Sequence, residues 1–504
     1  MSRTSFTFID LFCGAGGASI GFERAGFELA LATDIDSQAL DTLRENLKLA
    51  HPATREEAVI HADITDLYEL LGVGRVESET LGETTVLTKK AEAIKRKAPK
   101  DLNDQKVREF LSGLTTCDVV VGGPPCQGFS LIGRSKRGSA EERASGFVDD
   151  PRNILFRYFL KFIERLKPKV VLIENVKGLR SAHGYEEEIK LALRHTAPFY
   201  EVEPIVLNAA NFGVAQNRER IFFIGVRKDV AKATGIFPSQ IIQRLRDSSQ
   251  AQQISLIDSI GDLPQIRSNP HPNNYESEAE VPMPDPESFG EDISRAAYSS
   301  LLGDELIRFI NKTHPPKSWG LFADENPTAT KERCEEYRSF INKGPDDTLI
   351  PIGHLYNHKA RYNNDRDLKI YRDLVPGEYL TSDAHSNLIK EIPYGVTITD
   401  GVTELNGFAD KYFKLSPDRP SKTIVAHLET DGNAFVHPGP HPRSITPREA
   451  ARIQSFPDWY RFTGTLRQQY RQIGNAVPPL LAFAIAQEFM KLLKSIPESS
   501  NFHS

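Results

Sequence analysis

Short runs of consecutive apolar residues alternate with longer stretches of helical period in the first part of the chain. The apolar runs predict buried strands at residues 6–12, 27–33, 59–63, 117–122 and 169–174. A helical pattern follows the first run, and another covers residues 154–166. Because strands buried on both faces are joined by crossover helices, this order predicts an α/β fold with a Rossmann-like, doubly wound, mostly parallel sheet.

The pattern changes after Gly225. Pro, Asn, Ser and charged residues dominate residues 228–418, and their periodicity is weak. Order returns near Arg419, and residues 478–493 predict an amphipathic helix. We therefore expect three parts: residues 1–228 form most of the sheet domain, residues 229–438 form a smaller, loop-rich second domain, and residues 439–504 return to complete the first.

Composition narrows the class of protein. The chain has 504 residues, of which 26% are charged and 39% hydrophobic, as in soluble globular proteins. We see no signal peptide and no apolar run long enough to span a bilayer, so we expect a cytoplasmic location. The four cysteines form no CxxC pair, so no metal site is expected. The net charge of −6 gives a nucleic-acid role no help, so any phosphate binding needs a local basic face.

Polar residues gather where the predicted strands end. The first strand runs into a Gly-rich turn at residues 12–21, which lets a ligand approach the backbone closely. Asp34 ends the second strand at the distance that suits a ribose hydroxyl pair, and Asp63 ends the third, where it could bind an adenine amino group. These elements predict an adenosine-bearing cofactor. NAD is a less favoured cofactor, because Ser19 occupies the position at which a dinucleotide-binding fingerprint has Gly or Ala.

Cys126 follows the fourth strand and the rigid pair Pro124-Pro125. The prolines exclude a helix and present the sulfur from a stiff turn, as a nucleophile requires. A free cysteine is as often a small buried apolar residue, so Cys126 alone leaves both readings open.

Two further polar motifs end or begin strands. Glu174 closes the fifth strand, where burial would raise its pKa and let it hold a proton, unless it is simply solvated at the strand edge. Gln216, Arg218 and Arg220 alternate just before a strand at residues 221–226, so they share one side and offer donors to a phosphate or carbonyl. The alternative is surface ion pairing with Glu219.

These motifs together resemble those of the DNA (cytosine-5) methyltransferase family. The resemblance rests on the Gly-rich turn, the strand-end acids, Pro-Pro-Cys-Gln at 124–127, Glu-Asn-Val at 174–176 and Gln-x-Arg-x-Arg at 216–220. It continues in Arg-Pro-x-x-Thr at 419–423, in residues 446–458 and in residues 472–479. All occur in the family's order, over about the first 228 and the last 66 residues. The resemblance implies that residues 229–438 are the target recognition domain.

The resemblance also implies a mechanism and a type of system. Cys126 would add to C6 of a cytosine flipped from duplex DNA, and C5 would take a methyl group from S-adenosyl-L-methionine. Glu174 would bind ring N3, Arg220 would bind the O2 atom of the base, and Arg218 would hold a nearby phosphate. The family's layout further implies a monomer that serves restriction–modification beside a separate restriction endonuclease.

The remaining contacts are also carried over from the family. The cofactor would be bound by Phe12, Gly14, Ala15, Gly16, Gly17, Asp34, Ile35, Asp63, Ile64, Pro125, Leu155 and Asn475. DNA would be bound by Gln127, Ser130, Arg134, Arg152 and Thr423. We expect residues 128–150 to form a lid over the flipped base.

Several alternatives stay open. The same chemistry could act on RNA, such as tRNA, or the chain could be a catalytically silent DNA-binding regulator. Residues 69–111 interrupt the strand and helix pattern and contain a basic stretch at residues 89–100, where a solvated helix face is favoured over a DNA-contacting arm. At residues 357–361, a DNA contact competes with structural hydrogen bonding by His358. The recognised base sequence is not predicted.

Overall fold

The computed structural model describes most of the chain. The described residues are 5–50, 56–70, 104–124, 153–179, 185–249, 253–263, 266–269, 281–282, 327–344, 354–380, 396–399, 402–405 and 411–497.

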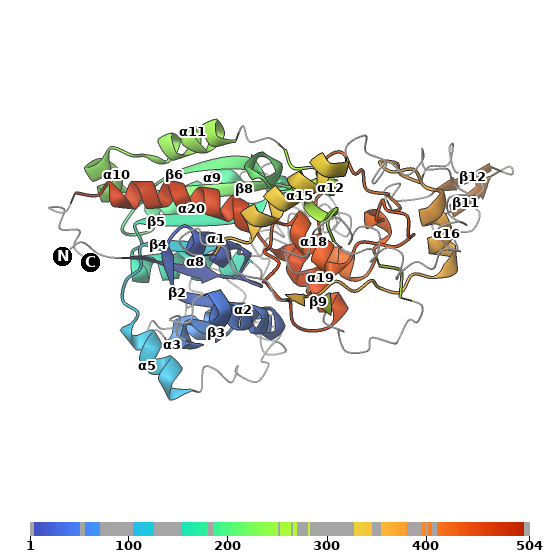
Figure 1. Ribbon diagram of the computed structural model, residues 1–504. Helices are drawn as coiled ribbons and strands as arrows, with labels where there is room; N and C mark the ends of the chain where they lie inside the picture. Colours follow the sequence, from blue (N-terminus) through green and yellow to red (C-terminus); the bar gives the residue numbers. More distant parts are fainter. Residues whose placement is uncertain are drawn as a thin grey trace.

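A seven-stranded sheet in the order β3-β2-β1-β4-β5-β8-β6 forms the centre of the larger part (Figure 1). Five strands are parallel: β1 (Phe6–Leu11), β2 (Phe27–Asp34), β3 (Val59–His61), β4 (Val119–Gly122) and β5 (Val170–Val176). Strand β8 (Glu219–Arg227) runs antiparallel to both β5 and the edge strand β6 (Tyr200–Asn208). The predicted α/β class and mostly parallel sheet are confirmed, and β6 is an addition that the sequence interpretation did not include.

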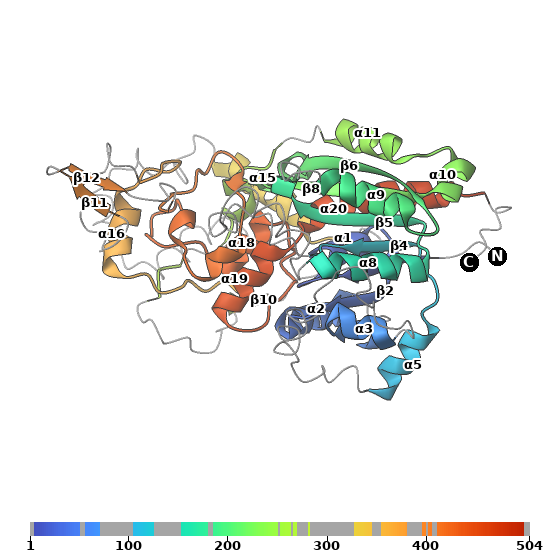
Figure 2. The same cartoon turned by 180° about the vertical axis from the view of Figure 1, so that it is seen from behind.

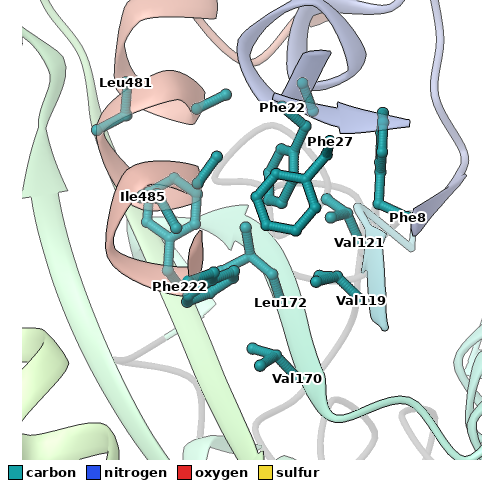
Figure 3. Close-up of a cluster of buried hydrophobic side chains, with 14 of the residues drawn as sticks. Phe8, Phe22, Phe27, Val119, Val121, Val170, Leu172, Phe222, Leu481 and Ile485 are labelled. Carbon is teal, nitrogen blue, oxygen red and sulfur yellow. The ribbon is translucent and has the colours of Figure 1, made fainter. Parts of the chain in front are cut away.

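Helices cover both faces of this sheet. On one face lie α1 (Gly17–Arg24), α2 (Ser37–Ala50), α10 (Lys228–Thr234), α11 (Pro238–Ser248) and α20 (Pro479–Lys494). Their apolar side chains pack with those of the strands, and Figure 3 shows Phe22 of α1 and Leu481 of α20 in this core. The other face is covered by α3 (Ile64–Leu70), α5 (Gln105–Gly113), α8 (Asn153–Leu166) and α9 (Tyr185–His195). Short 3-10 turns join the elements at η1 (Glu56–Ala58), η3 (Lys177–Leu179) and η4 (Ala209–Phe212).

The core of the sheet extends past the boundary expected at residue 228. Ile241 and Leu245 of α11 are fully buried in the same cluster as Phe222 and Ile224 of β8. Helix α20 of the C-terminal segment runs along the sheet in both views (Figures 1 and 2). The stretch Leu466–Lys494 is long and apolar enough to cross a membrane, but 67% of its apolar window is buried inside the protein, as in the core helix of a globular domain.

The second part lies at one end of the molecule and is rich in loops (Figure 2). Its helices are α12 (Leu256–Ile260), α15 (Pro327–Ile341) and α16 (Asp365–Asp373), with 3-10 turns η8 (Ala426–Glu429) and η9 (Asn433–Phe435). Two helices of the return segment, α18 (Pro447–Ile453) and α19 (Leu466–Asn475), pack against α12 and η8 of this part. Its strands are short and pair as β9 (Val281–Pro282) with β10 (His354–Leu355), and as β11 (Val396–Thr399) with β12 (Val402–Leu405). A parallel pair, β7 (Gln216–Asn217) with β13 (Ser421–Lys422), joins this part to the lead into β8.

Ion pairs between buried side chains connect α18 to the residues that surround it. Arg443 binds Glu449 through two hydrogen bonds of 2.7 and 2.6 Å, and both side chains are at most 1% exposed. Arg452 pairs with Asp458 at 2.7 Å and with Asp262. Although burial opposes ionisation, Arg443 keeps the pKa of Glu449 below its ordinary value. Breaking such a pair would leave a buried charge uncompensated, which makes this segment a rigid support.

Candidate active site

The Gly-rich turn after β1 is held open by left-handed backbone and by Asp34. Gly14 and Gly16 have φ angles of 53° and 75°, and Phe12 also adopts a positive φ of 63°. Asp34 accepts hydrogen bonds from the amides of Gly14 at 2.8 Å and Asp36 at 2.9 Å. Burial raises the pKa of Asp34, and these backbone donors oppose that shift. Asp34 Oδ2 therefore braces the turn, while Oδ1 holds the Asp36 amide after β2, and a contact of Asp34 with a ribose stays a prediction.

Ser19 explains one departure from a dinucleotide-binding pattern. Its hydroxyl donates a 2.6 Å hydrogen bond to Asp10, directly beneath the turn. Burial raises the pKa of Asp10 to about 7, although the hydrogen bond from Ser19 opposes the shift. A Gly or Ala at position 19 would remove this hydroxyl donor from the buried carboxyl.

The return segment braces the same turn from the other side. The Tyr460 hydroxyl donates to the carbonyl of Ala15 at 2.6 Å. A Cβ added to Gly17 would lie 2.2 Å from the carbonyl oxygen of Val477, so only glycine fits there. Asn475 is exposed at the end of α19, two residues before Val477. The fold thus brings this C-terminal residue to the Gly-rich turn, while its contact with a cofactor stays a prediction.

The neighbouring strand ends present an apolar surface beside acids. Ile35 follows β2 and is 51% exposed. Asp63 accepts two hydrogen bonds from Thr65 through one oxygen, and its second oxygen has no partner among the described residues. Ile64 is buried in the core, so its side chain supports α3, whereas Phe12 and Leu155 are half-buried.

Glu174 and Arg220 form an ion pair at the ends of adjacent strands. Glu174 Oε1 lies 3.0 Å from Arg220 Nε, and the two side chains are 18% and 15% exposed. A Cβ added to Gly123 would lie 3.2 Å from Glu174 Oε2, so the carboxylate faces the backbone just after β4. Glu219 pairs with Lys177 at 2.7 Å and not with Arg218 or Arg220, so the alternative of surface pairing between these arginines and Glu219 is wrong. The carboxylate and guanidinium predicted to bind one base are therefore brought together.

Asn175 ties the end of β5 to the approach to Cys126. Its side-chain amide donates to the carbonyl of Pro124 at 3.3 Å, and its oxygen accepts from the Val176 amide at 2.8 Å. Pro124 is the last described residue before Cys126. Asn175 belongs to the Glu-Asn-Val motif at residues 174–176, but the sequence predicted no role for it.

Six predicted site residues lie outside the described part of the chain: Pro125, Cys126, Gln127, Ser130, Arg134 and Arg152. The predicted lid at residues 128–150 and the basic stretch at residues 89–100 also lie outside it.

Arg218 differs from its predicted role as a phosphate ligand. It is 2% exposed, and its two terminal nitrogens donate to the carbonyls of Ile424 at 2.7 Å and Gly474 at 3.1 Å. Burial lowers its pKa well below the ordinary value, and Arg220 adds to this effect. The prediction for Arg218 is therefore corrected: its guanidinium is buried behind the site, where it binds the carbonyls of Ile424 and of Gly474 in the return segment.

Two other predicted polar segments also take part in packing. The Thr423 hydroxyl donates to the carbonyl of Asn217 at 2.6 Å, so its contact with DNA stays a prediction. His358 is 9% exposed and hydrogen-bonds to Thr446 at 3.1 Å, which confirms the structural alternative. Arg361 stacks on Tyr470 at 4.3 Å. Among the described residues, no cluster of His, Cys, Asp and Glu could hold a metal ion.

Comparison with known proteins agrees with this arrangement. The chain is 31% identical over 500 residues to the type II methyltransferase M.AgeI of Thalassovita gelatinovora, covering 95% of this chain and 98% of that one. It is 29% identical to the type II methyltransferase M.XorII of Xanthomonas oryzae pv. oryzae, covering 97% and 86%. Its fold is similar to the crystal structure of a prophage-encoded DNA modification methyltransferase of E. coli, with a TM-score of 0.54 and 24% identity over 97% of this chain and 100% of that one.

The family model described as C-5 cytosine-specific DNA methylase matches residues 6–72 and 87–491. This span includes the Gly-rich turn, the Glu174–Arg220 pair and most of the return segment. The chain therefore belongs to the C-5 cytosine-specific DNA methylases, enzymes that methylate DNA with the help of a methyl donor.

Proposed function

We propose that this protein transfers methyl groups from S-adenosyl-L-methionine to C5 of a cytosine within a specific sequence of duplex DNA. The observation that carries the proposal is the Glu174–Arg220 pair beside Gly123 and Pro124. Because β1, β4 and β5 are adjacent and parallel, Glu174 and the Gly-rich turn lie toward the carboxyl ends of neighbouring strands, and the antiparallel β8 brings Arg220 to the same edge. Ligands of open α/β sheets bind at that edge.

The residues present fit S-adenosyl-L-methionine. The Gly14 to Gly17 backbone would approach its sulfonium and ribose, the exposed Ile35 would pack on adenine, and the second oxygen of Asp63 would accept from the adenine amino group. Asn475 would close the site from the return segment. When bound, this cofactor supplies an electrophilic methyl group.

Cytosine C5 is a weak nucleophile, and the chain's own residues overcome this. The Cys126 thiolate forms a bond to C6, which places electron density on C5. Glu174 hydrogen-bonds or protonates ring N3, and Arg220 donates to O2, so negative charge is not left on the ring. After C5 is methylated, loss of its proton restores the double bond and breaks the bond from sulfur to C6. A cytosine stacked in a duplex could not meet these residues, so the base would be flipped out of the helix.

The cellular setting is part of the same proposal. The relatives are named as type II methyltransferases. We propose that this chain acts in a restriction–modification system, as a monomer in the cytoplasm, on DNA that a separate endonuclease would otherwise cut.

The test is transfer of labelled methyl from S-adenosyl-L-methionine to duplex DNA of mixed sequence. Wild type is compared with Cys126→Ser and Glu174→Gln. Label on DNA should vanish with Cys126→Ser and fall about 10²- to 10³-fold with Glu174→Gln. Label on tRNA instead of DNA would contradict the proposal that duplex DNA is the substrate. Label that survives in Cys126→Ser would overturn the mechanism.

A further inference from the structure

Lys422 occupies a cage of three aromatic rings. Its ammonium lies 5.3 Å from the ring centre of Tyr379, 5.2 Å from Phe413 and 5.4 Å from Phe435. The rings of Tyr379 and Phe413 also pack against each other, with centres 4.3 Å apart. A cation within about 6 Å of a ring centre is attracted by the electron-rich face of the ring.

The three rings come from three segments of the second part. Tyr379 follows α16, Phe413 bridges to it as an isolated β-pair, and Phe435 ends η9. Phe435 is 2% exposed and belongs to the core around α18, whereas Tyr379 is 38% exposed. The cage is therefore anchored on one side and open on the other.

The backbone of Lys422 belongs to the catalytic side. In β13 it pairs with Asn217 of β7, and the next residue, Thr423, hydrogen-bonds to the same Asn217. The chain runs from β7 through Arg218 into β8, which carries Arg220. The side chain of Lys422 thus lies in the aromatic cage, while its backbone pairs with the segment that leads into the strand carrying Arg220.

We infer that Lys422 is a positioning residue that fixes the second part against the strand carrying Arg220, and so sets how bound DNA meets the site. The inference rests on the proposed function. It differs from a direct phosphate contact, in which an exposed lysine would reach the DNA backbone. The rings hold the ammonium among protein side chains, and its neighbour Thr423 is the residue predicted to face DNA.

The test compares Lys422→Met, Lys422→Arg, Tyr379→Leu and the double variant Lys422→Met/Tyr379→Leu with wild type. Met keeps the length and apolar packing of Lys without its charge, and Arg keeps a cation that stacks on rings. Lys494→Met is the matched control, because Lys494 is an exposed lysine near the end of α20. Steady-state methylation gives KM for DNA, KM for the cofactor and kcat, and each DNA Kd is measured over a range of salt.

For Lys422→Met we expect the KM for DNA to rise fivefold to tenfold, with the cofactor KM changed less than twofold. Lys422→Arg should stay within about threefold of wild type. Tyr379→Leu should reproduce part of the effect, and the double variant should be no worse than Lys422→Met, because both act through one contact. The salt slope of DNA binding should be unchanged.

Three outcomes would overturn the inference. An unchanged KM for DNA in Lys422→Met would remove the positioning role. A salt slope lowered by about one, with no effect of Tyr379→Leu, would instead make Lys422 a phosphate ligand. An equal loss in Lys494→Met would make the effect one of net charge. If wild type binds DNA without methylating it, the proposed function fails, while the binding constants still decide the role of Lys422.

Discussion

Replacing Arg218 should weaken folding and leave the electrostatic part of DNA binding intact. The guanidinium is buried, and it donates to the carbonyls of Ile424 and Gly474, which belong to two different segments. Arg218→Met keeps much of the side-chain volume and removes both hydrogen bonds. Arg218→Lys keeps the charge, but a single ammonium cannot reproduce the planar fork of donors.

The size of the effect follows from these contacts. A hydrogen bond with a charged donor contributes about 1.5–3 kcal/mol, and Arg218 makes two such bonds to otherwise buried carbonyls. Removing the buried charge relieves part of its desolvation cost, which offsets some of this loss. We therefore expect Arg218→Met to lower the free energy of unfolding by about 3 kcal/mol. Arg419→Met is the control, because Arg419 is 68% exposed and pairs with an exposed aspartate, so its loss should cost less than about 0.5 kcal/mol.

Urea unfolding followed by circular dichroism measures the midpoint for each variant. DNA binding over a range of salt concentrations gives the number of phosphates contacted. Arg218→Met should lower the midpoint and leave the salt slope as in wild type. The reasoning is refuted if the midpoint is unchanged and the slope falls by about one, because Arg218 would then hold a phosphate as its motif first suggested.

Two further predictions concern the Gly-rich turn. Gly17→Ala should weaken cofactor binding at least tenfold in calorimetry, because its Cβ would meet the backbone carbonyl of Val477 at 2.2 Å and overpacking costs about 1–3 kcal/mol. Gly113→Ala, whose Cβ would meet nothing within 4 Å, should bind as wild type does, and equal binding by Gly17→Ala would contradict the argument. Asp10→Asn should flatten the pH dependence of the melting temperature, since burial raises the pKa of Asp10 to about 7 from 3.8 despite its bond with Ser19. Because the pKa is raised in the folded state, the protonated carboxyl stabilises the fold below pH 4 by at most about 4 kcal/mol, and this contribution is lost as the pH rises to 7. If the melting temperatures of wild type and Asp10→Asn change with pH in parallel, the carboxyl is ionised throughout and the argument is wrong.

The sheet could be predicted from sequence where its strands are buried on both faces. The strands before Gly14, Asp34 and Pro124 read as continuous apolar runs, and such runs have few other interpretations. Strand β6 (Tyr200–Asn208) was not predicted, because Pro204 interrupts it and glutamates alternate with its apolar residues. An edge strand tolerates both, since one of its sides needs no hydrogen-bonding partner.

The sequence predicted which residue types form the site, but it could not predict what surrounds each side chain. Arg218 and Arg220 stand two apart, and the alternation that suggested similar roles says nothing about what covers each one. Arg220 meets Glu174 beside Gly123, where a base could bind, whereas Arg218 lies under residues more than 200 positions later in the chain. Contacts of that sequence separation leave no periodicity to read.

The return segment supports both sides of the site, in addition to the cofactor contact proposed for Asn475. Gly474 accepts a hydrogen bond from Arg218, and a Cβ there would lie 2.4 Å from the Ala426 amide nitrogen. Tyr460 and Val477, from the same segment, press on Ala15 and Gly17 of the cofactor turn. One segment thus supports the base-binding side and the cofactor side together. A change that loosens it should therefore weaken both ligands at once, whereas a change at Lys422 should affect DNA alone, and this contrast separates support of the whole site from positioning of the substrate.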